Sequence, residues 1–104
     1  MSSSPAGFTK EIIVLVKIEA KPGSEERLVE LVAALSKIAN SDEEPGCLTF
    51  RVVRSGSSFV AFEKYKDADA LKKHAESKAF LEFVAAAEEL LVEKPTVTYY
   101  EELF

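Results

Sequence analysis

One stretch of the chain carries three side chains that could move protons. His74 is the only histidine among the 104 residues, and imidazole exchanges protons near neutral pH. Glu63 and Tyr65 stand two residues apart, a spacing that puts both side chains on one face of a strand. Glu63 could orient His74, or act as a base itself if burial raised its pKa. The three residues therefore indicate proton transfer to or from a small molecule.

Each of these residues could also have a purely structural role. His74 follows Leu71 by three positions and so shares its inward-leaning helical face, yet a helix histidine often only hydrogen-bonds a neighbour. Glu63 could pair across a sheet with Arg51 or a lysine. Tyr65 could simply fill space. The spacing alone leaves these alternatives open.

Aromatic side chains could form a pocket near this group. Four residues could wall it: Phe50, Phe62, Phe80 and Phe83. Aromatic residues at such positions are more often plain core. Tyr99 and Tyr100 fall on opposite faces of the last expected strand, so one would face the core and the other a partner.

Hydrophobic periodicity predicts the elements that position these residues. Four segments rich in apolar and β-branched residues predict strands: 11–21, 47–54, 58–65 and 96–103. Residues 24–40 predict an amphipathic helix with Ser24 as its N-cap, and 67–91 predict a helical region capped by Asp67 and bent or restarted at Ser77. The order βαββαβ predicts an α+β, ferredoxin-like fold, in which a four-stranded antiparallel sheet carries its helices on one face.

The expected strands carry apolar side chains on both faces. Helices cover only one face, which leaves Ile13, Leu15, Val60 and Phe62 as candidates for the other. An exposed apolar patch of this kind marks a partner surface. We therefore expect a twofold homodimer, sheet face against sheet face. The alternative is that the centre of the sheet tolerates some exposed apolar residues.

Composition and charge exclude several classes of partner. The net charge is −5 and the lysines are scattered, which argues against nucleic acid or an anionic membrane as a partner. Cys47, the only cysteine, cannot form an intramolecular disulfide or a cysteine zinc site, and we expect it to be inert. The sequence shows neither a secretory signal nor an apolar run long enough to cross a membrane.

We therefore expect a cytoplasmic protein with residues 1–9 as a flexible tail and 10–104 as a single domain. The sequence contains no nucleotide-binding loop and no metal-ligand cluster, so we predict no metal and no cofactor.

Several short motifs carry a family resemblance when they are taken in order. They are Glu44-Pro45-Gly46-Cys47, Glu63-Lys64-Tyr65, Asp67, His74 and Ser77-Lys78-Ala79-Phe80. Together they resemble the antibiotic biosynthesis monooxygenase superfamily, and the resemblance covers residues 11–103. It implies a dimeric α+β barrel, with a pocket between sheet and helices in each protomer. It also implies cofactor-free oxidation of a small quinol or polyhydroxylated aromatic compound with O2.

The resemblance also implies roles for individual residues. His74 and Glu63 would be catalytic, with His74 assisting proton transfer, and Tyr65 would contact the substrate together with Phe50, Phe80 and Phe83.

Some family positions hold other residues in this chain. Tyr65 stands where the family often has Trp, and Ala79 where a second His often follows. These departures favour an alternative, a non-catalytic barrel that binds a small hydrophobic ligand or serves a stress or regulatory role. Another activity, such as isomerisation, could use the same scaffold. Val16, His74 and Val84 stand near the Asn, Trp and His of the haem-degrading branch, so we do not expect haem degradation.

Overall fold

Four strands and three α-helices alternate in the order that the hydrophobic pattern predicts. The computed structural model describes residues 7–8 and 11–104. In chain order its elements are β1 (Ile12–Glu19), α1 (Glu25–Ala39), β2 (Cys47–Ser55), β3 (Ser58–Tyr65), α2 (Ala68–Glu76), α3 (Lys78–Ala87), the 3-10 turn η1 (Glu88–Leu90) and β4 (Thr96–Glu101). No helix in these described ranges is both long and apolar enough to cross a membrane.

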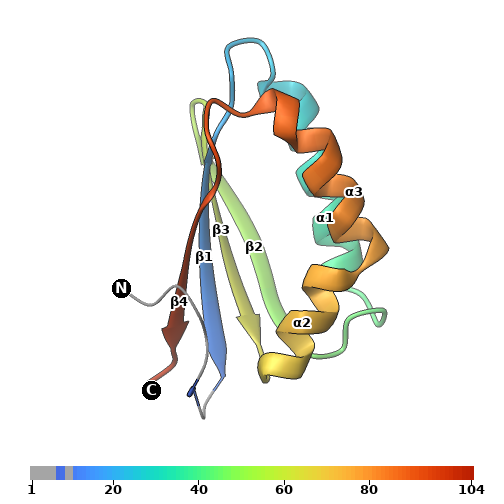
Figure 1. Ribbon diagram of the computed structural model, residues 1–104, viewed down its shortest axis with the longest axis vertical. Coiled ribbons are helices and arrows are strands. Elements are labelled where there is room, and N and C mark those ends of the chain that lie inside the picture. The colour runs from blue at the N-terminus through green and yellow to red at the C-terminus, as the bar shows by residue number, and fades with distance from the viewer. Residues whose placement is uncertain (1–6, 9–10) are drawn as a thin grey trace.

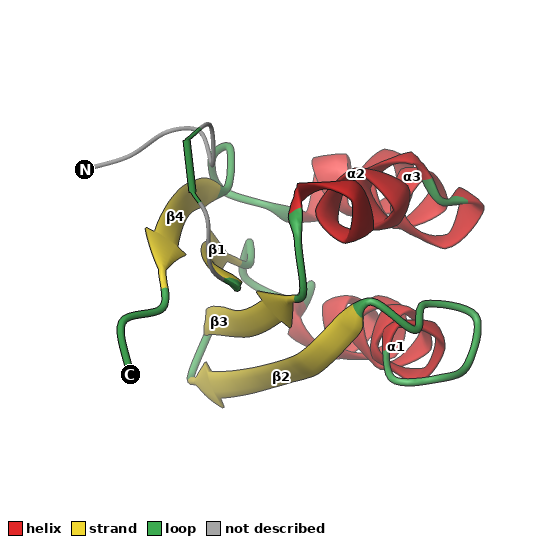
Figure 2. Ribbon diagram, turned by 90° about the horizontal axis from the view of Figure 1, so that it is seen from below, coloured by secondary structure: helices red, strands yellow, loops and turns green. Residues whose placement is uncertain are grey.

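The strands form one antiparallel sheet in the order β2-β3-β1-β4. The helices lie on one side of it, and no element of the described residues covers the opposite face (Figures 1 and 2). This arrangement confirms the predicted ferredoxin-like fold. Side chains alternate across the sheet, so Ile12 and Val14 point toward the helices and are 1% and 3% exposed.

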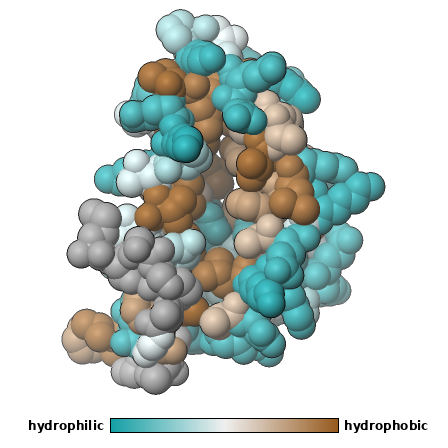
Figure 3. Space-filling view, in the orientation of Figure 1, coloured by the Kyte–Doolittle hydropathy of each residue, from teal (hydrophilic) through white to brown (hydrophobic). Residues whose placement is uncertain are grey.

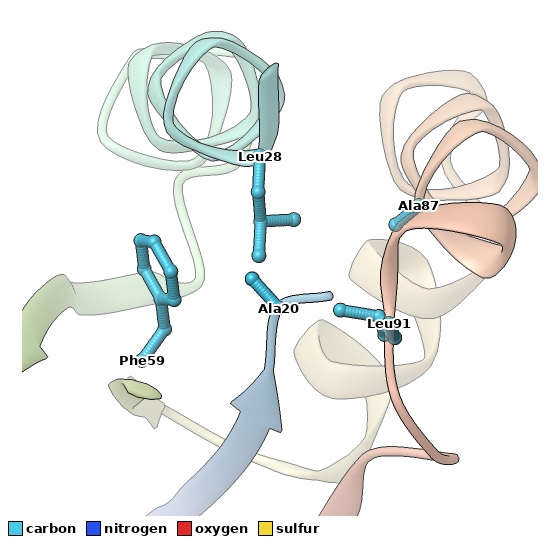
Figure 4. Close-up of a cluster of buried hydrophobic side chains, with 5 residues drawn as sticks. All are labelled: Ala20, Leu28, Phe59, Ala87 and Leu91. Atoms are coloured by element: carbon cyan, nitrogen blue, oxygen red, sulfur yellow. The ribbon is translucent and has the colours of Figure 1, made fainter. Parts of the chain in front are cut away.

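One end of the layer between sheet and helices is filled by apolar side chains. The filled cluster consists of Ala20, Leu28, Phe59, Ala87 and Leu91, all buried (Figure 4). Ala20 and Leu91 also form an isolated backbone bridge, which joins the end of β1 to the segment before β4. Leu28 of α1 is completely buried there. This cluster ties the first helix, the third helix and the sheet together.

Ser77 separates α2 from α3, as the expected restart predicts. Its extended backbone (φ −68°, ψ 150°) breaks the helical path. Its Oγ accepts a hydrogen bond from the backbone N–H of Phe80 at 3.1 Å and donates to the His74 carbonyl at 2.8 Å. The break places His74 in the last turn of α2 and Phe80 in the first turn of α3, side by side in space.

The other two helices differ in how they begin. Asp67 accepts a hydrogen bond from the Ala70 N–H at 2.9 Å, which confirms it as the cap of α2. Ser24 occupies the N-cap position of α1, but its side chain makes no capping hydrogen bond. The predicted position of Ser24 is therefore right and its predicted bond is absent.

The uncovered sheet face carries the apolar residues expected there. Leu15 lies opposite Phe62 in the register of β1 and β3, and Phe62 is 42% exposed. Tyr100 lies on this face and is exposed, whereas Tyr99 points to the helix side. Ile13 is already buried within the chain.

Most of the segment expected to be a flexible tail, residues 1–6 and 9, lies outside the described residues. Of that segment the structure describes Gly7 and Phe8. Phe8 packs, partly buried, against a cluster that includes Ile12 and Tyr65.

Candidate functional site

A cavity of about 190 Å³ lies between the sheet and the helices. Figure 3, seen in the orientation of Figure 1, shows a hollow with apolar residues around it. Strands contribute residues such as Val14 and Ala61 to its wall, and α3 contributes Phe80 and Phe83. The polar side chains on the wall are Glu63, His74 and Tyr99. The cavity is therefore an apolar space with a small polar group at one part of its wall.

His74 is held at this wall by a single hydrogen bond. Its side chain is 3% exposed, and Nδ1 lies 2.7 Å from Oε1 of Glu44. A carboxylate can only accept a hydrogen bond, so we assign the proton to Nδ1. Nε2 then carries the lone pair, and it has no hydrogen-bond partner among the described residues. An imidazole in this state can act as a base at Nε2.

Three aromatic rings surround the imidazole. The ring centroids of Phe50, Tyr65 and Phe80 lie 5.7, 5.4 and 5.1 Å from that of His74. These rings fix the orientation of the side chain and keep water away from it. In such low-dielectric surroundings, hydrogen bonds and charges at His74 act more strongly than they would in water.

Glu63 and Tyr65 form the second part of the polar group. The Tyr65 hydroxyl donates to Oε1 of Glu63 at 2.6 Å, and the same oxygen lies 3.9 Å from Nε2 of His74. Burial raises the pKa of the Glu63 carboxyl, against the lowering effects of the Tyr65 hydrogen bond and of His74. Burial, with the charge of Glu63, also raises the pKa of Tyr65, so its hydroxyl keeps its proton. We call Glu44, Glu63, Tyr65 and His74 the His74 network.

A close backbone approach brings Glu44 to His74. A Cβ atom built on Gly46 would lie 2.4 Å from the Cβ of Ala70, so only glycine lets the turn lie this close to α2. The Gly46 carbonyl accepts from the Lys66 N–H at 2.9 Å, which fixes the turn to the end of β3. Ala70 stands one helical turn before His74, so the docked turn carries Glu44 to the imidazole.

The structure brings most of the predicted site residues together. His74 and Glu63 line the cavity, as do Phe50, Phe80 and Phe83. Tyr65 is fully buried behind Glu63 and meets the site through its hydrogen bond rather than on the cavity wall.

The pocket role considered for Phe62 is wrong. Its position in β3 turns it to the opposite face of the sheet, next to Leu15. Arg51 pairs with Phe62 on that same outer face, so it is not a partner of Glu63. Glu63 instead points to the helix side, where Tyr65 and His74 meet it.

Sequence reasoning missed Glu44 as the partner of His74. The only signal was its place in the Glu44-Pro45-Gly46-Cys47 motif, because the two residues are 30 positions apart and meet only in the fold. Cys47, in the same motif, is partly buried, and burial raises the pKa of its thiol to about 11. A thiol that stays protonated is a poor nucleophile. In the described ranges, no three His, Cys, Asp or Glu side chains form a metal-ligand group.

Known proteins resemble this chain in sequence along most of its length. An uncharacterized protein, sll1783 of Synechocystis, is 29% identical over 98 residues, which cover 91% of this chain. The chain spans 65% of the length of that relative.

Solved structures share the fold. Rv0793 from Mycobacterium tuberculosis is 27% identical, with a TM-score of 0.85 over 90% of this chain and 96% of its own. A putative antibiotic biosynthesis monooxygenase from Caulobacter crescentus CB15 superposes with a TM-score of 0.88 over 93% of both chains, at 24% identity.

The family model for antibiotic biosynthesis monooxygenases matches residues 11–86. That range includes β1 to β3, the turn with Glu44, and the helix that carries His74. This match supports a monooxygenase-like role. The chain belongs to the antibiotic biosynthesis monooxygenase family.

Proposed function

We propose that this protein is a cofactor-independent monooxygenase that oxidises a small quinol or polyhydroxylated aromatic compound with O2. The observation that carries the proposal is the unpartnered Nε2 of His74 at the wall of an apolar cavity. A buried base beside a dry pocket can ionise a phenolic hydroxyl, and the resulting anion is electron-rich enough to react with O2. Polar groups converge on His74, which favours an enzyme over a passive ligand-binding barrel.

The size of the cavity favours a substrate with one ring. Its volume of about 190 Å³ is close to the roughly 150 Å³ in which an apolar cavity holds one benzene molecule. Phe50, Phe80 and Phe83 would pack against the ring, while its hydroxyl groups would lie against Nε2 of His74 and the carboxylate of Glu63. A polycyclic compound would have to enlarge the site.

The reaction can be balanced without an outside reductant. A benzenediol and O2 give a hydroxyquinone and one water, so one oxygen atom enters the ring and the other leaves as water. The four electrons that reduce O2 come from the substrate. His74 takes a hydroxyl proton at Nε2 at the start and returns one to the oxygen that leaves. Glu63 can accept a hydrogen bond from a second substrate hydroxyl, and the Tyr65 hydroxyl holds Glu63 in place for it.

Oxygen uptake by the purified protein tests this function. The substrates are one-ring benzenediols and benzenetriols, set against two- and three-ring quinols, without added metal or flavin. We expect one O2 consumed per one-ring substrate, no hydrogen peroxide, and incorporation of one labelled oxygen atom. His74→Ala should lower kcat by about 10²–10⁴-fold. Lys72→Ala, at an exposed position on the same helix, is the matched control and should keep full activity.

Two results would contradict the proposal. Uptake no faster than the autoxidation of each substrate would favour the alternative, a barrel that binds a small hydrophobic ligand without turnover. Uptake that yields one hydrogen peroxide per quinol would show two-electron oxidation without oxygen insertion.

We also propose that the protein forms a homodimer through the uncovered sheet face. Phe62, Val53 and Tyr100 on this face are 42%, 64% and 45% exposed, a large apolar area for a monomer. A second copy buries the same patch on both partners around a twofold axis. Phe62→Glu should therefore give a monomer in sedimentation, whereas Val29→Glu, at a similarly exposed valine on α1 (36%), should not. A wild-type monomer would contradict this assignment.

A further inference from the structure

A second pocket lies on the other side of Glu44 from the cavity. It has a volume of about 330 Å³ and is lined by the motif turn, the two residues that follow β3, and α2. Its charged lining residues include Lys66, Asp69 and Lys73, all exposed. We call it the outer pocket. Glu44 is its inner charged residue, because its side chain is only 9% exposed.

The carboxylate of Glu44 has one oxygen in use and one free. Oε1 accepts from Nδ1 of His74 at 2.7 Å. Oε2 is buried and has no hydrogen-bond partner among the described residues. A buried carboxylate oxygen without a partner is costly, so its retention beside a charged pocket indicates a use.

His74 and Glu44 thus form a bridge between two different spaces. His74 lines the apolar cavity, and Glu44 lines the polar outer pocket. A ring bound in the cavity would separate Nε2 from solvent on that side. The route from the imidazole to solvent then passes through Nδ1 and Glu44.

We propose that Glu44 is the positioning and proton-exchange partner of His74, and that the outer pocket is where protons enter and leave the site. The proton-exchange part rests on the proposed function, whereas the positioning part does not. Glu44 holds the imidazole with its proton on Nδ1, which keeps Nε2 free as the base. It is a positioning residue because it touches His74 and does not line the cavity.

The proton steps balance over one turnover. Nε2 takes a hydroxyl proton from the substrate, so that an O–H bond of the substrate breaks and an N–H bond forms at Nε2. Nδ1 then passes its own proton to Oε1 of Glu44, which releases a proton to water in the outer pocket. When oxygen leaves as water, Nε2 returns its proton to it, and Glu44 takes up a solvent proton to restore the N–H bond at Nδ1. One proton leaves and one returns.

Nitrogen NMR of the imidazole tests the positioning role without any substrate. His74 is the only histidine in the chain, so the imidazole nitrogen signals need no assignment to a residue, only to Nδ1 or Nε2. When the imidazole is neutral, we expect a single tautomer, with the proton on Nδ1. Glu44→Ala should lose this preference, while Asp42→Ala, which removes an exposed carboxylate nearby, should not. A wild-type protein with the proton on Nε2 would overturn the proposal, as would an unchanged tautomer in Glu44→Ala.

Rescue by a small acid tests the proton-exchange role. Glu44→Ala should lower kcat by at least about tenfold and leave KM unchanged, because the cavity wall stays intact. Added formate, which fits the vacated part of the outer pocket, should raise the kcat of this variant several-fold and saturate. It should not raise the activity of His74→Ala. Glu44→Ala that gains nothing from formate would overturn the proton route.

The two experiments separate this inference from the proposed function. If the wild-type protein oxidises no quinol, the proposed function fails, and the tautomer measurement still decides whether Glu44 positions His74. If the wild-type protein turns over and the tautomer is unchanged in Glu44→Ala, the function stands and the role of Glu44 falls.

Discussion

The two ends of the layer between sheet and helices are built in opposite ways. At one end, the filled cluster contains only apolar side chains, and Leu28 at its centre is 0% exposed. At the other end, the His74 network buries two carboxylates and an imidazole beside a cavity. The first arrangement gains free energy by removing apolar surface from water. The second costs free energy, because charged groups lose their hydration.

The difference indicates which end supports the other. A marginally stable domain can keep a costly polar group only where packing elsewhere offsets it. The filled cluster joins α1, α3 and β3 at one end, and so holds the helices over the sheet. The cavity begins at Phe59 of this cluster and extends to His74. Sites that destabilise the protein at a functional position are common in enzymes.

The first prediction compares one substitution at both ends. Leu28→Ala in the filled cluster should lower the free energy of unfolding by about 3–4 kcal/mol, because it removes a fully buried side chain and leaves a void. Leu71→Ala, at a half-buried residue on the cavity wall, should cost less than half as much. Urea unfolding of both variants measures the two costs. Equal costs would contradict the contrast between a filled end and an open end.

The second prediction concerns the close approach of the motif turn to α2. Gly46→Ala puts a methyl group into the space of the Ala70 side chain and should cost roughly 1–3 kcal/mol of stability. The shifted turn should also break the contact between Glu44 and His74. Gly46→Ala combined with Ala70→Gly makes room again, so the double variant should be more stable than the sum of the two single effects. If the two single effects on the free energy of unfolding simply add in the double variant, the turn accommodates the extra methyl group without strain.

The third prediction uses the raised pKa of Glu63. Since burial raises it in the folded protein, the unfolded chain releases this proton at a lower pH than the folded protein does. The contribution of Glu63 to stability therefore falls as pH rises above the ordinary carboxyl value, until the folded carboxyl has ionised as well. Glu63→Gln removes this pH-dependent loss of stability, and its amide oxygen can still accept the hydrogen bond from the Tyr65 hydroxyl.

We expect the free energy of unfolding of Glu63→Gln to rise by about 1 kcal/mol relative to that of the wild type between pH 4 and pH 7. The variant should also lose activity. Thermal unfolding across that range measures the gain. Carboxyl groups outside the His74 network are common to both proteins, so their effects cancel in the difference. A difference that stays constant with pH would contradict the raised pKa.

Local patterns account for what the sequence could predict. Segments rich in apolar and β-branched residues predicted every strand, and β3 begins and ends at the predicted residues, Ser58 and Tyr65. The turn residues and the cap at Asp67 predicted where helices begin. These features depend on neighbours in the chain, so periodicity and capping rules reach them.

The pairing of Glu44 with His74 depends on distant parts of the chain. It requires a turn before β2 to dock on a helix after β3, through a glycine whose role only the fold reveals. The cavity has the same origin, since no local pattern says whether Phe80 and Phe83 fill a space or surround one. Both gaps come from tertiary packing rather than from a misjudged strand or helix.

The smallest predicted effect compares the helix starts at the two ends. Ser77→Ala removes a hydrogen bond to the Phe80 N–H and another to the His74 carbonyl, and should cost about 1 kcal/mol. Ser24→Ala, at the start of α1 near the filled cluster, removes no capping bond and should change stability by less than about 0.5 kcal/mol. Urea unfolding gives both values. Ser77→Ala should also weaken the preference of His74 for a single tautomer, because the bond to the His74 carbonyl fixes the end of α2. A large effect at Ser24 and none at Ser77 would mean that the apolar end, not the polar end, depends on side-chain caps.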